Sequence, residues 1–244
     1  PEVYTPDTAA FLQHKLGARE VPTYDLGGSG CAGFLQALDI ARSRLLTGRR
    51  NMLVIGVELI SRLIDWENRS IAVLFGDGAG AAVLSTNANG SEILAAKAGT
   101  DGSQAEILTL EAGGTRVPLS QEVLDSRAHK NLVMDGRSVF KHAVTRMSAV
   151  SREVLELGGA SIDDLKMVFP HQANLRILTA VAAQLELPEE KLYVEVDEYG
   201  NTGSASVPLA LAHARDQGVV GRGDLVLLTA FGAGFHWAAM LIRL

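Results

Sequence analysis

The sequence lacks several features that would place it in a large class of proteins. It has a single cysteine among 244 residues, which excludes an internal disulfide framework and fits a reducing compartment. Lys and Arg form no long run and the net charge is -6, so nucleic acid is not expected as a partner. No two histidines stand at metal-ligand spacing with a carboxylate, and we therefore expect no metal site.

A long uninterrupted apolar stretch is also missing. The longest apolar run, 225–241, is broken by Thr229, Gly232, Gly234 and His236. Two buried strands around a glycine turn explain this pattern better than a membrane span. The end of the chain is therefore predicted to be a pair of strands.

What the sequence does contain is an alternation of strand and helix patterns, which indicates an α/β layered protein. We predict helices at 5–17, 31–48, 138–157, 173–187 and 200–218 from their apolar spacing. We predict strands at 21–26, 51–58, 71–75, 80–85, 91–99, 165–169, 224–231 and 236–243.

The two halves of the chain repeat one order of elements. A small-residue loop, a helix, "TGRRNMLVIGVE" and "FGDG" in the first half match a loop, a helix, "VGRGDLVLLTA" and "FGAG" in the second. We therefore expect two halves, 1–86 and 87–244. The helix at 5–17 corresponds to the helix at 174–187, and the first half lacks counterparts of several later elements. A longer precursor is expected to supply them.

Cys31 lies in "DLGGSGCAGF", where a glycine loop leads into a helix. Unpaired N–H groups and the helix dipole at that position lower a thiol pKa and favour thiolate. The glycines leave room for a substrate carbonyl beside a backbone N–H. A free cysteine is also commonly a small buried apolar residue, and this segment alone does not separate the two interpretations.

The same segment contains G-x-G-x-x-G at Gly28, Gly30 and Gly33, which is also typical of a dinucleotide-binding loop. Glu58 follows at the end of the next strand, roughly where an acid would bind a ribose. This alternative is the weaker one, because the loop is too long for a tight turn and Cys31 would have no role.

Two further polar residues stand where an α/β protein places its site. His171 in "FPHQANLRI" follows a strand directly and precedes a helix. Asn201 lies in "YGNTGSAS", a second small-residue loop before a helix, and the duplication matches it to Cys31. Each residue also has an ordinary structural explanation, a core histidine and a helix-capping asparagine. The "GDGAG" at 76–80 is interpreted as a structural turn.

Together, Cys31 in "CAGF", His171 in "PHQANLRI" and Asn201 in "GNTGSASVP" resemble the Cys-His-Asn condensing enzymes of the thiolase fold. Among them the chain is most similar to the β-ketoacyl-acyl-carrier-protein synthase III family. The resemblance implies duplicated αβαβα layers with mixed five-stranded sheets, the first half being incomplete at its N-terminus. It also implies a cytoplasmic homodimer.

The resemblance implies a reaction in two stages. Cys31 takes the acyl group of an acyl-CoA, and malonyl-acyl-carrier protein then enters and loses CO2. His171 and Asn201 stabilise the enolate that attacks the acyl group, and the N–H groups of Cys31 and Ala233 form the oxyanion hole. No metal or redox cofactor is implied, and CoA thioesters are the substrates.

The remaining residues are carried over by position from the same resemblance. Arg69, Gly136 and Asn174 are expected to bind CoA, and Lys141 and Arg176 to dock the carrier protein. The docking patch is weaker than in relatives, so a condensing enzyme of polyketide metabolism that uses CoA esters stays an alternative. A thiolase would need a second cysteine in "FGAGFHW", and an NAD-binding oxidoreductase or a non-catalytic subunit are further hypotheses.

Overall fold

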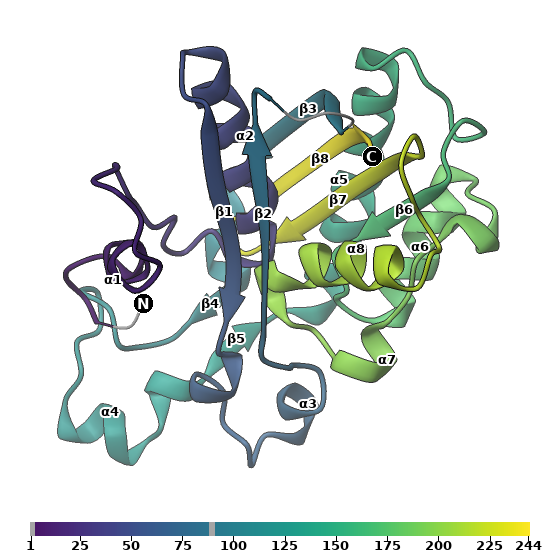
Figure 1. The fold of residues 1–244 in the computed structure, drawn as a ribbon. Helices are drawn as coiled ribbons and strands as arrows, with labels where there is room; N and C mark the ends of the chain where they lie inside the picture. The colour runs from purple at the N-terminus through teal and green to yellow at the C-terminus, as the bar shows by residue number, and fades with distance from the viewer. Residues whose placement is uncertain (1–2, 88–90) are drawn as a thin grey trace.

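The computed structural model describes residues 3–87 and 91–244, which form stacked layers of helices and sheets (Figure 1). The strands are β1 (Asn51–Glu58), β2 (Gly78–Ser85), β3 (Glu92–Thr100), β4 (Leu108–Leu110), β5 (Leu132–Met134), β6 (Met167–Pro170), β7 (Leu225–Gly232) and β8 (His236–Arg243). The α-helices are α1 (Thr8–Lys15), α2 (Gly33–Leu46), α3 (Arg69–Ala72), α4 (Gln121–Asp125), α5 (Gly136–Leu157), α6 (Leu175–Leu185), α7 (Val196–Tyr199) and α8 (Ser206–Asp216).

A mixed sheet of order β3-β8-β7-β6 forms the centre of the molecule. Strand β6 runs parallel to β7, whereas β7 and β8, and β8 and β3, are antiparallel. Every residue of β7 is buried, because helices cover the sheet on both faces. The apolar run at 225–241 is thus the β7–β8 hairpin, as predicted. None of the helices in the described part of the chain is long and apolar enough to cross a membrane.

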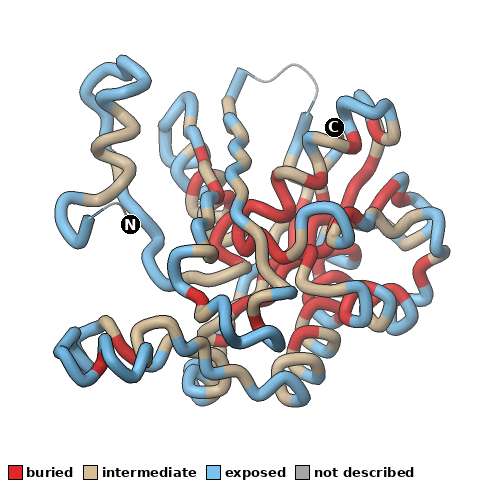
Figure 2. The backbone as a smooth tube through the Cα atoms, turned by 90° about the horizontal axis from the view of Figure 1, so that it is seen from below, coloured by how far each residue is buried: buried red, intermediate tan, exposed pale blue. Residues whose placement is uncertain are grey.

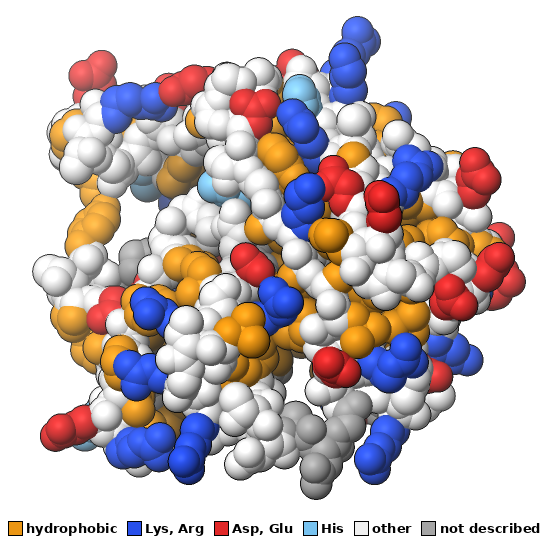
Figure 3. All heavy atoms as spheres, turned by 90° about the horizontal axis from the view of Figure 1, so that it is seen from above, with side chains coloured by type: hydrophobic (Ala, Val, Ile, Leu, Met, Phe, Trp, Pro, Cys, Tyr) orange, Lys and Arg blue, Asp and Glu red, His pale blue; other side chains and the backbone are white. Residues whose placement is uncertain are grey.

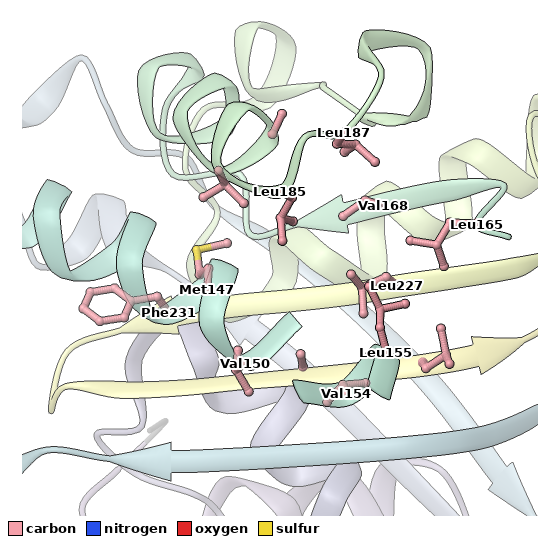
Figure 4. Packing of buried hydrophobic residues seen from close by; sticks show 14 of the residues in the cluster. Met147, Val150, Val154, Leu155, Leu165, Val168, Leu185, Leu187, Leu227 and Phe231 are labelled. Carbon is pink, nitrogen blue, oxygen red and sulfur yellow. The ribbon is translucent and has the colours of Figure 1, made fainter. Parts of the chain in front are cut away.

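Each face of this sheet has its own hydrophobic core. On one face α5 packs on the strands and α6 packs on α5, and Met147, Val154, Leu185 and Leu227 belong to the core there (Figure 4). On the other face α2 and α8 contribute residues such as Phe34 and Val207. Figure 2 shows the buried residues gathered in the middle of the layers, with exposed segments at the periphery. The core therefore fixes helices from both halves of the sequence to one sheet.

The β1–β2 ribbon forms a further layer on the far side of α2 and α8. Strand β1 contacts α2 and β2 contacts α8. Glycines make this contact possible, because a Cβ on Gly80 would come within 2.8 Å of Pro208 in α8. The order of layers is therefore α5/α6, central sheet, α2/α8 and ribbon, which confirms the thiolase-like α/β layering.

The duplication is visible as two copies of one unit. A single-turn 3₁₀ helix, Gly30–Ala32 or Gly203–Ala205, leads into α2 or α8, and each is followed by an antiparallel strand pair. Both 3₁₀ turns start at a glycine with positive φ, 54° and 58°. Cys31 therefore corresponds to Ser204, and the expectation that it corresponds to Asn201 is wrong by three residues.

Several predicted elements differ in the structure. Residues 21–26 form no strand; they are mostly exposed, and Asp25 instead accepts the N–H groups of Thr8 and Ala9 at the start of α1. Residues 71–75 form no strand either: Ile71 and Ala72 end α3, and Phe75 forms an isolated bridge with Asn201. Ile71 is buried, whereas Val73 is 71% exposed. Helix α1 has no buried residue, unlike α6, to which the duplication matched it.

The expected five-stranded sheets are also not seen among the described residues. The central sheet has four strands, and the place beyond β6 is taken only by an isolated bridge between Val168 and Leu192. The ribbon has two strands. The division of the chain at 86/87 stays a prediction. Residues of both parts share a core, since Phe34 and Val54 cluster with Phe169 and Val226.

Candidate active site

Cys31, His171 and Asn201 line one cavity of about 740 Å³. Cys31 lies in the 3₁₀ turn before α2, His171 follows β6, and Asn201 precedes the 3₁₀ turn before α8. The Cys31 Sγ atom lies 4.0 Å from Oδ1 of Asn201. The duplicated unit thus brings together three residues that are up to 170 positions apart in the sequence.

The backbone around Cys31 is packed tightly against the end of β7. A Cβ on Gly232 would lie 2.5 Å from the Cys31 nitrogen, and a Cβ on Gly30 would lie 3.0 Å from the Ala233 nitrogen. The φ angle of Ala233 is not positive, so alanine fits the turn in place of glycine. The two N–H groups that the sequence assigns to an oxyanion hole therefore belong to adjoining backbone segments.

The pKa of the Cys31 thiol differs from the expectation. Burial and, to a smaller extent, the carboxylate of Glu58 together raise the pKa of Cys31 to about 12, although the Asn201 hydrogen bond acts in the opposite direction. The expected lowering of the thiol pKa by the helix is therefore wrong. A low-dielectric cavity with a negative neighbour disfavours thiolate more strongly than one helix end favours it. Cys31 rests as a neutral thiol.

His171 is almost fully buried, with 2% of its surface exposed. Its backbone N–H donates to Thr229 O at 2.7 Å, and its Nδ1 lies 2.7 Å from the hydroxyl of Ser206. The same hydroxyl accepts the N–H of Gln172 at 3.2 Å. Burial lowers the pKa of His171 to about 4, so the imidazole is neutral at pH 7.

Asn201 is held by hydrogen bonds of its backbone and of its side-chain oxygen Oδ1. Its N–H donates to Leu74 O at 2.8 Å, and its carbonyl accepts the Gly76 N–H at 3.0 Å. Its Oδ1 accepts the Gly203 N–H at 2.8 Å, which leaves the amide NH₂ as the donor for a ligand. A Cβ on Gly76 would lie 2.2 Å from Tyr199 O, so Gly76 packs closely on the chain before Asn201. The prediction of a turn over 76–80 is wrong for its second part, because strand β2 already begins at Gly78.

The residues assigned to CoA and to the carrier protein separate into two groups. Gly136, Asn174 and Arg176 line the cavity, and Asn174 also caps α6 through the Ile177 N–H at 3.0 Å. Arg69 and Lys141 are exposed and lie outside the lining. Figure 3 shows basic and acidic side chains interspersed over one face of the molecule. The roles of these five residues stay predictions.

Sequence reasoning missed part of the site. Ser206, the first residue of α8, holds His171. Glu58, which the sequence suggests only as a ribose ligand, lies in the cavity wall. The apolar wall is not predicted by the sequence either. It comes from the antiparallel pair β4–β5 and from α5, with Leu108, Leu110, Leu132, Met134, Phe140 and Met147. Strand pairs of three residues give almost no periodic signal.

The dinucleotide alternative does not fit the structure. No strand precedes the glycines at 21–26, and the space beside Gly30 and Gly33 is filled by Ala233 and Ser29. The segment therefore lacks the preceding strand and the close backbone access at Gly30 and Gly33 that a dinucleotide-binding loop needs. Across residues 3–87 and 91–244, no group of three or more His, Cys, Asp and Glu side chains is arranged to hold a metal ion.

Comparison with known proteins gives consistent matches. The family 3-oxoacyl-[acyl-carrier-protein (ACP)] synthase III matches residues 24–102, and its C-terminal part matches 155–244. The chain is 43% identical to the β-ketoacyl-[acyl-carrier-protein] synthase III of Roseiflexus sp. (strain RS-1), over 100% of the chain and 74% of that protein. The solved 3-oxoacyl-[acyl-carrier-protein] synthase III of Aquifex aeolicus VF5 is 43% identical, with a TM-score of 0.89 over 100% and 74%. The priming β-ketosynthase from the R1128 polyketide biosynthetic pathway is 36% identical, with a TM-score of 0.86 over 100% and 72%.

Proposed function

The chain belongs to the β-ketoacyl-[acyl-carrier-protein] synthase III family, and we propose that Cys31, His171 and Asn201 carry the reaction of that family in this protein. The enzyme is an acyltransferase that condenses an acyl-CoA primer with malonyl-acyl-carrier protein and so initiates fatty acid synthesis. The family uses no cofactor beyond its CoA thioester. The observation that carries the assignment of residues is their convergence in one largely apolar cavity.

The first stage transfers the acyl group to Cys31. The S–C bond to Cys31 forms, the thioester bond to CoA breaks, and the proton of the thiol ends on the CoA sulfur. Because burial keeps the thiol protonated, its proton must leave as the sulfur attacks. The N–H groups of Cys31 and Ala233 stabilise the negative charge that develops on the carbonyl oxygen.

The second stage breaks the C–C bond to CO2 in the malonyl thioester and forms the new C–C bond to the acyl carbon. The S–C bond to Cys31 breaks in the same stage, and the released sulfur takes up a proton to restore the thiol. We assign the Ser206 hydroxyl as the donor to Nδ1 of His171, which places the ring proton on Nε2. Neutral His171 and the NH₂ of Asn201 then both donate to the thioester oxygen and stabilise the enolate. The carbanion comes from decarboxylation, so no base is needed to remove a proton from carbon.

Acylation provides the direct test of the nucleophile. Incubation with acetyl-CoA is expected to add one acetyl mass to the peptide that contains Cys31, and Cys31→Ala abolishes the adduct. The Cys31→Ala chain also serves as the control for acylation elsewhere, since it removes the only cysteine. An enzyme that stays unmodified while it binds acetyl-CoA would overturn the covalent mechanism.

The proposal also assigns residues to the binding of CoA and of the carrier protein. Gly136, Asn174 and Arg176 line the cavity and support entry of the pantetheine arm from their side, with Arg176 also placed to meet an acidic carrier protein. Arg69 and Lys141 are exposed, as contacts to the adenine end of CoA and to a carrier protein would require. We also propose a homodimer, and a cytoplasmic location because Cys31 must stay reduced.

A priming enzyme of polyketide synthesis is the second candidate function. It is favoured by the 36% identity to the R1128 priming β-ketosynthase. The two functions share the chemistry and differ in the acyl group and the acceptor. Mass spectrometry of the acyl-enzyme formed from a panel of acyl-CoAs, followed by malonyl-acyl-carrier protein or malonyl-CoA, separates them.

A further inference from the structure

Glu58 is a charged residue of the cavity that the proposed reaction does not use. It is the last residue of β1 and lies in the cavity wall. The ionisable side chains that line the cavity are Cys31, Glu58, Arg137, His171 and Arg176. Glu58 is the one carboxylate among the described lining residues. A carboxylate is an unexpected component of a site that must admit an anionic malonyl group, so it needs a role.

The carboxylate is bonded to the turn that follows Asn201. Its Oε1 accepts the N–H of Ser204 at 3.2 Å. Gly203 lies directly against it, because a Cβ there would be 2.5 Å from Cγ of Glu58. The N–H of Gly203 in turn donates to Oδ1 of Asn201 at 2.8 Å. Glu58 thus holds Ser204, the neighbour of Gly203, and the Gly203 N–H sets the orientation of the Asn201 amide.

The rest of β1 supports the same turn. A Cβ on Gly56 would lie 2.7 Å from Ser204 O, so the strand and the turn are packed backbone to backbone. Strand β1 belongs to the first copy of the duplicated unit and the turn to the second. The bond from Glu58 therefore ties the copy that carries the nucleophile to the copy that carries Asn201.

We propose, on the basis of the function assigned above, that Glu58 is a positioning residue for the condensation stage: its carboxylate fixes the Gly203–Ser204 turn and thereby aims the Asn201 amide at the thioester oxygen. Its negative charge also acts on the neighbouring thiol. Glu58 raises the pKa of Cys31 in addition to burial, which favours the neutral thiol. Arg137, Arg176 and His171 are the other ionisable residues that line the same cavity.

Two variants separate the hydrogen bond from the charge. Glu58→Gln keeps an oxygen that accepts the Ser204 N–H but removes the charge, whereas Glu58→Ala removes both. Alkylation of Cys31 by iodoacetamide as a function of pH measures the charge effect without any substrate. We expect its midpoint to fall by about one pH unit in both variants, because one neighbouring charge is lost.

Decarboxylation of malonyl-acyl-carrier protein measures the positioning effect. We expect Glu58→Gln to retain it within about threefold, and Glu58→Ala to reduce kcat about tenfold or more, because the turn loses its partner. Asp164→Asn is the matched control, since Asp164 accepts the Ser161 N–H at 2.8 Å outside the cavity lining. It should change neither the alkylation profile nor the decarboxylation.

Each result is decisive for one part of the proposal. Full decarboxylation in Glu58→Ala, or equal loss in both variants, overturns the positioning role, and an unchanged alkylation profile in Glu58→Gln overturns the electrostatic one. If Glu58→Ala does not fold, as seen by circular dichroism, Glu58→Gln still tests the charge, and Glu58→Asp tests whether a shorter carboxylate rescues the turn. Failure of the wild type to form an acetyl-enzyme would instead overturn the proposed function and leave the alkylation result standing.

Discussion

The hydroxyl of Ser206 lies 2.7 Å from Nδ1 of His171, at the first residue of α8. Both residues are buried, and the hydroxyl also accepts the Gln172 N–H. A hydroxyl in this place fixes which nitrogen of a neutral imidazole carries the proton. The donor strength of His171 toward the cavity thus depends on a residue that does not line it.

Replacing Ser206 tests this dependence. Ser206→Ala is expected to reduce decarboxylation of malonyl-acyl-carrier protein about tenfold, because the ring loses the partner that sets its tautomer. Acylation of Cys31 by acetyl-CoA should change little. Ser206→Thr restores the hydroxyl and should recover much of the rate. Equal loss of both stages in Ser206→Ala, with Ser206→Thr no better, would show that the residue only supports the local packing.

Replacing His171 or Asn201 separates the two stages of the reaction directly. His171→Ala and Asn201→Ala are each expected to lower decarboxylative condensation by about a hundredfold or more, since each removes a donor to the enolate oxygen. The acetyl-enzyme should still form, as followed by mass spectrometry. A loss of acylation that parallels the loss of condensation would contradict the division of roles.

The buried His171 predicts a specific dependence of stability on pH. Its pKa is about 4 in the folded protein, against 6.5 for an unperturbed histidine, so between these values the unfolded chain binds more protons. Stability therefore rises with pH across that window and is lost as the pH falls through it, by about 3 kcal/mol at most. Denaturant unfolding of the wild type and of His171→Gln between pH 4.5 and 7 measures this contribution. The free energy of unfolding should depend less steeply on pH in the variant than in the wild type. Parallel curves for the two proteins would contradict the contribution of His171.

The contact between Gly232 and Cys31 predicts a strong effect of one methyl group. A Cβ on Gly232 would lie 2.5 Å from the Cys31 nitrogen, so Gly232→Ala must displace the nucleophile turn. We expect acylation by acetyl-CoA to fall about tenfold or more, with loss of stability. Gly221→Ala is the control, because nothing lies within 4 Å of a Cβ there. Normal acylation in Gly232→Ala would mean that the turn has more freedom than its packing indicates.

Much of the fold follows from pattern alone. Strand β1 was predicted at 51–58 with its observed limits, and the β7–β8 hairpin and α5 within two residues, because each has a strong apolar period. The segments 21–26 and 71–75 were wrong for a common reason. Their composition suits a strand, but a strand also needs a neighbour in a sheet, and neither segment has one over its length.

The sequence, with its family resemblance, singles out three residues that the structure brings to one cavity, but it does not give their environment. Cys31, His171 and Asn201 stand out because each follows or precedes an element that an α/β fold brings to one edge. The pKa of Cys31 depends instead on how many apolar groups surround it and on Glu58, which is 27 positions away in the sequence. The apolar wall from β4 and β5 arises from long-range packing, and no local pattern reports it.

The packing of Gly232 against Cys31 also bears on which residues each position of this turn can accept. At position 232 the constraint is on side-chain volume, and only glycine satisfies it. At position 233 the group that matters is the backbone N–H, so any residue that adopts an ordinary φ satisfies the constraint. Two adjacent positions of one turn are thus constrained in different ways, one by side-chain volume and the other only by backbone conformation. Alanine in this chain is an example of the second.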